Sequence, residues 1–131
     1  MEQDLVAALL GNAGLTAHVG TRINWTLRPQ GKGTPALVLH KVASGREYTM
    51  DGRIGLTGHL VQMDLWADRP AALFAARDAL LAALDALTVA PFQGAFVESE
   101  RDGYEAPDGP QASGVVILHR ASLDVRVWHH A

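Results

Sequence analysis

The carboxy-terminal part of the chain alternates apolar and polar residues almost to its end, and this pattern constrains the fold most. Side chains at alternate positions of a β-strand point to opposite faces of its sheet. At about 3.3 Å per residue, a strand over residues 115–129 spans roughly 40 Å. One face carries Ile117, His119, Ala121, Leu123, Val125 and Val127, and the other carries Leu118, Arg120, Ser122, Asp124, Arg126 and Trp128. A strand this long, in a chain of 131 residues, predicts a sheet with one apolar face.

Three earlier stretches also predict strands: residues 36–44, 59–68 and 92–100. The second alternates clearly, with Val61, Met63 and Leu65 on one face and Leu60, Gln62, Asp64 and Trp66 on the other. The pair Asp51-Gly52 is a tight-turn signal. We expect a hairpin whose tip, within residues 45–58, is long rather than minimal. Stretches rich in proline and glycine predict loops over residues 26–35 and 101–114.

Residues 70–87 give the strongest helix signal, with Asp68 expected to cap the helix and Pro70 in its first turn. The leucine side, expected to face the sheet, carries Leu73, Phe74, Leu80, Leu81, Leu84 and Leu87, with Arg77 in its middle. The alanine side carries Ala72, Ala75, Ala79, Ala82, Ala83 and Ala86. Shorter helices are expected over residues 3–10, ending at Gly11, and before Gly20.

These elements predict one α+β domain over residues 1–131. Its sheet is expected to be antiparallel or mixed, with four strands, packed against one long helix at about residues 69–87 and short N-terminal helices. The formal net charge is −3, so the chain lacks the basic character of nucleic-acid binding proteins. It has no cysteine, which excludes disulfides and a thiol nucleophile. Neither a signal peptide nor a membrane span is indicated at the start of the chain.

Two surfaces have both a functional and an ordinary interpretation. The alanine side of the long helix is either a close-approach surface for a neighbouring subunit or a solvent-facing run of good helix formers. The polar strand faces predict an Asp–Arg ladder if the two strands are neighbours. That ladder is either a solvated outer face with weak ion pairs, or a charged surface shared with another subunit or lining a channel.

No catalytic motif stands out in the sequence. A small metal-dependent hydrolase using Asp64 and Asp124 is the alternative from a different functional class. The adjacent His129 and His130 would point to opposite faces of a strand, so they cannot chelate one ion together. We therefore predict no catalytic residue, no metal site and no cofactor.

The order of several short motifs resembles the tail-completion or tail-terminator family of long-tailed phages, prophages and gene transfer agents. The similarity covers nearly the whole chain. Each motif alone is weak, but their order and separation make the resemblance specific. They are Tyr48 with Asp51-Gly52, the strand with Gln62, Asp64 and Trp66, Asp102 with Tyr104-Glu105, and the closing run with Arg120, Ser122, Asp124, Trp128 and His129.

The resemblance implies a structural virion protein with a fold similar to the tail terminator of lambda-like phages. Such a protein forms a ring, expected to be a hexamer, at the head-proximal end of the tail tube. It stops tube polymerisation and joins the tail to the head connector, while DNA passes through the lumen without specific binding. The expected partners are therefore further copies of the chain, the tail tube protein and the connector or stopper protein. Assembly is expected in the bacterial cytoplasm, and no membrane is involved.

Candidate contact residues follow from this resemblance and from the two surfaces. The expected subunit interface comprises Ala75, Ala79, Ala82, Ala86, Asp64, Arg120, Asp124, Arg126 and Trp128. Loops 45–57 and 100–114 are expected to dock onto the tube or the connector through Arg46, Tyr48, Asp51, Asp102 and Tyr104. The final strand is expected to be held by a neighbouring subunit. Another head–tail joining protein, such as a stopper, is the alternative within the same biology.

Overall fold

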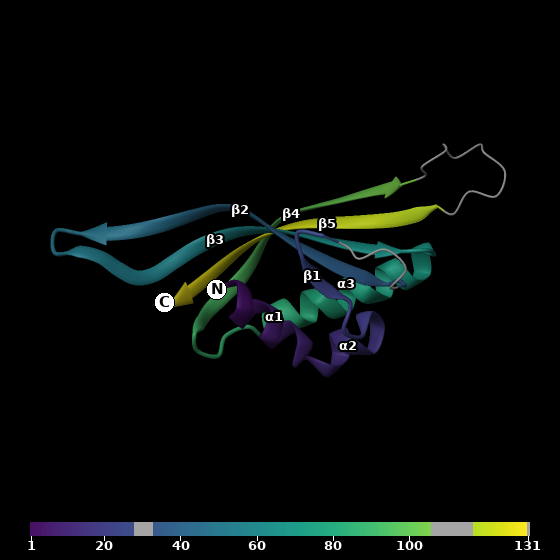
Figure 1. Ribbon diagram of the computed structural model, residues 1–131, viewed down its shortest axis with the longest axis horizontal. Coiled ribbons are helices and arrows are strands. Elements are labelled where there is room, and N and C mark those ends of the chain that lie inside the picture. The colour runs from purple at the N-terminus through teal and green to yellow at the C-terminus, as the bar shows by residue number, and fades with distance from the viewer. Residues whose placement is uncertain (28–32, 106–116, 131) are drawn as a thin grey trace.

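The computed structural model describes residues 1–27, 33–105 and 117–130, which contain three helices and five strands (Figure 1). In chain order these elements are α1 (Glu2–Leu10), α2 (Ala13–Val19), β1 (Ile23–Trp25), β2 (Ala36–Thr49), β3 (Gly52–Ala67), α3 (Pro70–Asp85), β4 (Phe92–Glu105) and β5 (Leu118–His130). The α+β class is therefore confirmed. No helix in the described ranges is long and apolar enough to cross a membrane.

The strands form one mixed sheet in the order β1-β2-β3-β5-β4. β1 is parallel to β2, and the other neighbouring pairs are antiparallel. The expected four-stranded sheet is therefore wrong by one strand. β1 has three residues, too few to show an alternating pattern, and its pairing with Leu37, Val38 and Leu39 brings it into the sheet.

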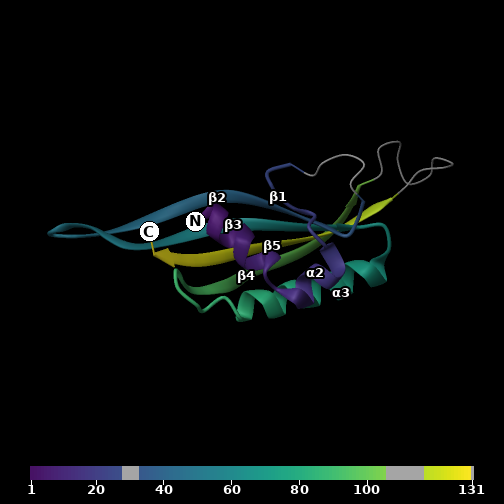
Figure 2. The same cartoon turned by 60° about the horizontal axis from the view of Figure 1, so that its bottom comes forward.

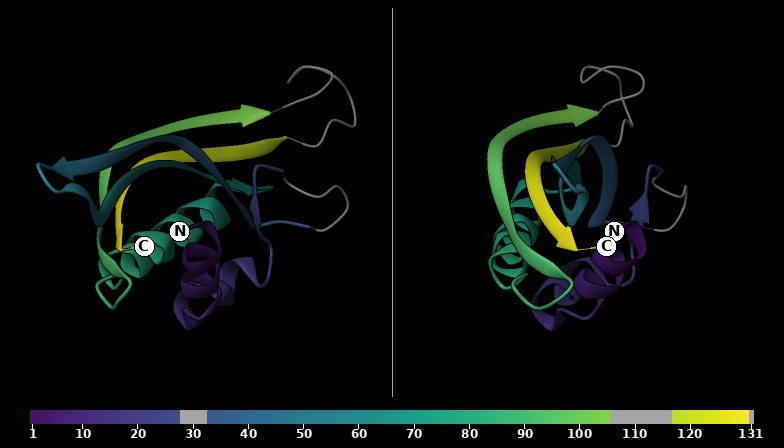
Figure 3. Two further views of the ribbon diagram at one scale, coloured as in Figure 1. Left: turned by 60° about the vertical axis from the view of Figure 1, so that its left-hand side comes forward. Right: turned by 90° about the vertical axis from the view of Figure 1, so that its left-hand side faces the viewer.

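The three helices lie on one face of the sheet, which bends around them (Figures 2 and 3). Val61, Met63 and Leu65 of β3 point into this layer and are fully buried. Their partners in the register, Val125, Leu123 and Ala121 of β5, are buried beside them. The predicted faces of both strands are thus confirmed. The other face of the sheet, which we call the open face, carries the polar rows.

Helix α3 begins at Pro70 as predicted and ends at Asp85, before the predicted end at residue 87. Its buried side differs from the expected leucine side. Leu73, Leu80 and Leu84 are buried as expected, together with Ala76 and Ala83, whereas Phe74 is 45% exposed. The small alanines let the helix lie close to the sheet, and Phe74 lies outside the contact. The N-cap is Arg69, without a side-chain hydrogen bond to the helix, so Asp68 is not the predicted cap.

The two short N-terminal helices are confirmed. Gly11 ends α1, and Asn12 caps α2 by accepting a hydrogen bond from the backbone N–H of Leu15 at 3.0 Å. Leu5, Leu9, Leu15 and Val19 are buried in the core. The polar segment between the helices therefore joins two elements that bury one apolar side each.

Strands β2 and β3 form a much longer hairpin than the sequence predicts. They pair as far as Thr49 and Gly52, so the tip is the two-residue turn at Met50 and Asp51. The expected long tip is therefore wrong. Every residue from Lys41 to Gly55 is exposed. We call residues 41–55 the arm, because they project beyond the helical layer (Figure 1).

Strand β4 continues to Glu105, so the predicted loop over residues 101–114 begins too early. Residues 106–114 of that prediction lie outside the described residues, as do residues 28–32 of the predicted loop over residues 26–35. Register pairs of β4 with β5 run as far as Glu105 and Leu118. Cross-strand hydrogen bonds thus hold a polar, glycine-containing segment as strand.

The final strand is ordered by its own chain. β5 lies between β3 and β4, and register pairs reach His130 on one side and His129 on the other. The His130 N–H also donates to the carbonyl oxygen of Pro91 at 2.8 Å. The regular pattern up to the terminus therefore comes from two neighbouring strands of the same subunit, and no neighbouring subunit is needed to explain it.

Candidate assembly surfaces

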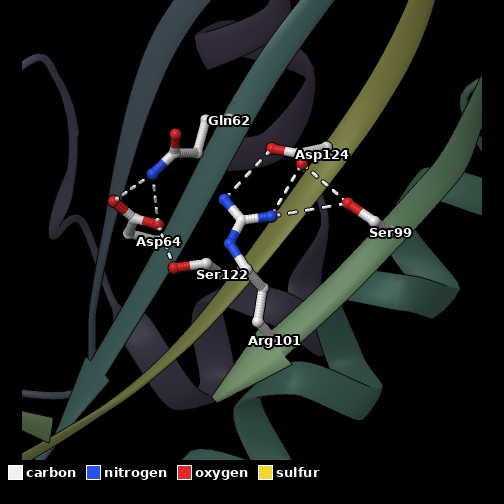
Figure 4. A network of polar contacts seen from close by, with 6 residues as sticks. All are labelled: Gln62, Asp64, Ser99, Arg101, Ser122 and Asp124. Atoms are coloured by element: carbon white, nitrogen blue, oxygen red, sulfur yellow. Dashed lines mark hydrogen bonds and ion pairs between the residues drawn. The ribbon is translucent and has the colours of Figure 1, made fainter. Parts of the chain in front are cut away.

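The open face carries a buried carboxylate at its centre (Figure 4). Asp64 of β3 is 6% exposed and accepts a hydrogen bond from the Ser122 hydroxyl on β5 at 2.6 Å. The Gln62 side-chain amide donates to both carboxylate oxygens of Asp64 at 3.1 Å. His40 of β2 lies 3.9 Å from the same carboxylate. Asp64 therefore joins three adjacent strands on the open face.

A second carboxylate on this face, Asp124 of β5, binds residues of the outer strand β4 (Figure 4). Arg101 donates to its two oxygens at 2.7 and 3.4 Å, and the Ser99 hydroxyl donates at 2.6 Å. Two hydrogen bonds lower the pKa of Asp124, and the one from Arg101 has a larger effect than the one from Ser99. The same pair raises the pKa of Arg101. Asp124 therefore stays ionised and bound to its own subunit.

The other predicted interface residues of the open face also have partners in the same subunit. Arg126 donates to Glu98 at 3.1 Å, and the guanidinium carbon of Arg120 lies 5.5 Å from the ring centroid of Trp66. The Trp128 ring lies over Gly58. Strands β3 and β5 are neighbours, which was the condition for an Asp–Arg ladder, but their register pairs Asp64 with Ser122 and Gln62 with Asp124, so the ladder does not form between them. The Arg101–Asp124 and Glu98–Arg126 ion pairs connect β4 to β5 instead.

This geometry does not assemble the metal-dependent hydrolase that the sequence left as an alternative. Asp64 is bound by Ser122 and Gln62, whereas Asp124 is bound by Arg101 and Ser99. Within the described ranges there is no group of three or more His, Cys, Asp or Glu side chains that could hold a metal ion. The two carboxylates therefore have structural partners and share no ligand set.

The alanine side of α3 is exposed in part. Ala75, Ala82 and Ala86 are exposed, whereas Ala79 is half-buried and packs against the core. Near the end of the helix, Ala86 lines a hollow of about 350 Å³ that is open to solvent between α1 and α3. Ala7 and Ala8 of α1, Ala83 of α3 and the segment that follows α3 also line it. The alanine side thus provides a shallow apolar surface.

The five predicted docking residues lie on strands or in a tight turn. Arg46 and Tyr48 lie on the β2 strand of the arm, and Asp51 lies in its turn. Asp102 and Tyr104 lie on β4, and Asp102 lines a small hollow together with Arg77 of α3. All five side chains are exposed, and Tyr48 and Tyr104 retain 67% and 60% of their accessible surface. The structure therefore gathers them on two projecting segments at opposite lateral edges of the sheet.

The two C-terminal histidines have separate partners. His129 is 5% exposed, and its Nε2 atom lies 2.8 Å from the Asp4 carboxylate of α1. The His130 Nε2 atom lies 2.9 Å from the side-chain amide of Gln93. The centroids of the His59 and His129 rings lie 6.2 Å apart. Burial has the largest effect on the pKa of His59 and lowers it, and the charge of Lys41 lowers it further. His129 therefore fastens the end of the chain to its first helix.

Sequence reasoning missed the partners supplied by β4 and α1. Ser99 and Arg101 bind Asp124, and Glu98 binds Arg126, although the sequence suggested a loop from residue 101 onward. Glu2 forms an ion pair with Lys41, which lowers the pKa of Glu2 to about 2 through their hydrogen bond. The charged residues between 98 and 102 could have suggested a paired strand. No local signal could have suggested the contact of Glu2 with Lys41.

Comparison with known proteins places this chain in a family. The family model described as "Tail completion protein gp17" matches residues 3–130. A solved chain from the structure described as "Virion of native gene transfer agent (GTA) particle" has a TM-score of 0.65 and 18% identity, covering 95% of this chain and 90% of that chain. That likeness shows a shared fold. No curated protein sequence matches the chain. Because the family model spans nearly all of the sequence, the chain belongs to the tail completion protein gp17 family and is a structural component of a virion tail, not an enzyme.

Proposed function

We propose that the chain is a tail terminator, which forms a ring at the head-proximal end of the tail tube. In this role it stops tube polymerisation at the correct length and presents a surface to the head connector. Membership of the tail completion family supports a place in the tail. The observation that carries the ring is the arm, because it exposes large side chains far from the core.

The arm is better suited to contact than to solvent. Three large side chains of the arm are exposed: Val42 at 56%, Tyr48 at 67% and Met50 completely. Exposed apolar surface of this kind marks interaction sites in soluble proteins. A projecting arm fits a surface on a second subunit that differs from the arm itself. Contacts between unlike surfaces generate rings when the rotation closes, and a hexamer is the ring size that we propose.

The open face is proposed to line the lumen through which DNA passes. The arginines Arg101, Arg120 and Arg126 each contact an acidic or aromatic partner in the same subunit. Binding of a DNA backbone depends on cations that neutralise phosphates. Arg101 and Arg126 are already paired with carboxylates, and the chain has a net charge of −3. Both features favour a surface along which DNA slides without being gripped. The alanine side of α3 is proposed as a further contact surface of the ring.

The first experiment measures the mass of the purified protein by light scattering, alone and mixed with its tail tube protein. We expect a hexamer of 14.0 kDa chains in at least one condition. In the mixture, electron microscopy should show tubes that stop elongating once the protein is added. A strict monomer in both conditions, with tubes that continue to grow, would contradict the proposal.

A further inference from the structure

The two lateral edges of the sheet are open over long stretches. In the described part of the chain, β1 covers only residues 37–39 of β2, and no strand covers the outer side of β4. Open edges present rows of unpaired backbone N–H and C=O groups that other chains can pair with. Bulges interrupt both edges, but β4 is regular from Ser99 to Glu105. This regular stretch is therefore the part of β4 that can accept another strand.

The arm and β4 both carry exposed charged side chains that could meet across a contact between two copies. Arg46 and Arg53 lie on the arm, and neither has an ion-pair partner within the described ranges. On β4, Glu100 and Asp102 are exposed and likewise have no such partner among the described residues. Neighbouring charges on both segments are already paired, as in Lys41 with Glu2 and Arg101 with Asp124. The arm also exposes Glu47 and Asp51. The complementary charges are therefore Arg46 and Arg53 on the arm and Glu100 and Asp102 on β4.

Exposed aromatic and apolar side chains accompany these charges on each edge. The arm exposes Tyr48 and Met50, and β4 exposes Phe96 at 58% and Tyr104 at 60%. Each set would lose contact with water if the two edges met. Apolar side chains surrounded by complementary charges are the usual anatomy of a protein interface. The edges therefore match in backbone, charge and apolar surface.

We infer that the arm of one copy lies along β4 of the next copy, with Arg46 and Arg53 facing Glu100 and Asp102. This inference rests on the proposed ring and names its subunit contact. The β2 strand of the arm, which carries Arg46, and β4 lie at opposite edges of one sheet, and Arg53 lies beside it on β3. Each copy therefore offers one half of the contact to each neighbour. Such a contact propagates head to tail, and it closes into a ring when the rotation between neighbouring copies closes. Strand addition along residues 99–105 supplies backbone hydrogen bonds.

Charge reversal tests this contact directly. The arm variant is Arg46→Glu with Arg53→Glu, and the strand variant is Glu100→Lys with Asp102→Lys. Each variant alone places like charges across every contact, so we expect self-association to weaken by about tenfold or more. Mixed in equal amounts, the two variants alternate around the ring and every contact again pairs opposite charges. Light scattering should then show the wild-type ring mass, which an alternating hexamer permits.

Arg69→Glu is the matched control, because it reverses an exposed charge that lies outside the arm and β4. The ring should then form as in the wild type. Circular dichroism and thermal melting confirm that every variant remains folded. If the arm and strand variants form wild-type rings separately, or if their mixture stays dissociated, the contact is not the one inferred.

Cross-linking gives a second measurement that is independent of charge. The chain has no cysteine, so an introduced pair reports one contact without background. One residue of the arm, Arg46 or Arg53, is changed to Cys together with Glu100→Cys or Asp102→Cys, giving four double variants. After oxidation, at least one of them should give a ladder of covalent oligomers that ends at the ring size. The single variants can give no band larger than a dimer, and the absence of a ladder from all four would overturn the inference.

The outcomes separate this inference from the proposed function. A wild-type ring that is insensitive to both charge variants and gives no ladder overturns the contact and leaves the ring terminator in place. A wild-type protein that is monomeric both alone and with the tube protein overturns the ring and the contact together. A ring that responds as described supports both.

Discussion

At the scale of single residues, two glycines let large side chains lie flat on the open face. A Cβ at Gly58 would lie 2.9 Å from ring atoms of Trp128, and a Cβ at Gly103 would lie 2.9 Å from the guanidinium of Arg120. Real Cβ contacts of this length essentially do not occur, so the side chain or the strand would have to shift. Trp128 and Arg120 thus owe their positions to residues without a side chain.

Gly58→Ala should destabilise the protein by about 1–3 kcal/mol, because the new methyl group meets the Trp128 ring. Gly45→Ala is the matched control. Gly45 pairs with Gly58 across the hairpin. A Cβ added at Gly45 would lie 3.7 Å from the nearest atom, the Gly58 carbonyl oxygen, which is an ordinary van der Waals contact. Urea denaturation of both variants measures the difference in the free energy of unfolding. Equal effects would show that the Trp128 contact has no energetic weight.

The buried carboxylate gives a second prediction at this scale. Asp64→Ala removes the acceptor of the Ser122 hydroxyl, which is 3% exposed. A buried donor without an acceptor costs about 1–3 kcal/mol. Ser122→Ala combined with Asp64→Ala should therefore lose less than the sum of the two single variants. A double-mutant cycle of unfolding free energies measures this coupling, and strict additivity would contradict it.

At the scale of elements, α1 fastens both the base of the arm and the end of the chain. Glu2 binds Lys41 on β2, and Asp4 binds His129 on β5. One side of the same helix buries Leu5 and Leu9 in the core. The ion pairs are partly exposed and individually weak. The apolar side of α1 therefore carries most of the energy, and the ion pairs fix where the helix lies.

Leu9→Ala should cost about 2–5 kcal/mol, because Leu9 is only 1% exposed and leaves a cavity. The adjacent Leu10 is 38% exposed, so Leu10→Ala should cost much less. Thermal and urea denaturation of the two variants provide the test. If Leu9→Ala and Leu10→Ala were equally stable, α1 would not be part of the core.

At the scale of the whole molecule, the free energy of unfolding should decrease as the pH falls. The decrease should occur in two pH ranges, an upper window set by His59 and a lower window set by Glu2 and Asp124. Unfolded His59 takes up a proton near its ordinary pKa of 6.5, whereas burial lowers its pKa in the folded protein. The unfolded state then binds more protons, so stability is lost as the pH drops from 6.5 through the lower folded pKa. The lowered pKa of Glu2 stabilises the folded protein above pH 4.5, the ordinary pKa of this carboxyl group. This stabilisation is lost as the pH falls to about 2. The lowered pKa of Asp124 acts in the same direction.

Melting temperatures between pH 8 and pH 2 test these windows. His59→Gln should flatten the upper window and leave the lower one unchanged. Glu2→Gln should reduce the lower window without abolishing it, since Asp124 still titrates there. A wild-type melting temperature that does not fall between pH 6.5 and pH 5 would contradict the assignment to His59.

Long elements with a regular pattern could be predicted from the sequence. The faces of β3 and β5 follow from strict alternation, and α3 follows from its length and from Pro70. The arm and the outer half of β4 could not be predicted, because glycines and charges interrupt their alternation. Cross-strand hydrogen bonds, which depend on residues far away in the chain, make these segments strands. The same holds for β1, which is too short to carry a pattern.

The predicted site residues show the same division. The sequence by itself determined which side chains are polar and exposed, and therefore placed Asp124, Arg126 and Tyr104 among the candidates. Only the tertiary structure decided that Asp124 binds Arg101, that Arg126 binds Glu98 and that Arg46 and Asp102 lie at opposite edges of the sheet. The physical reason is that local patterns report how one strand alternates, whereas strand order and register determine which charges meet. The sequence thus determined the faces of this sheet, and the tertiary structure determined its edges.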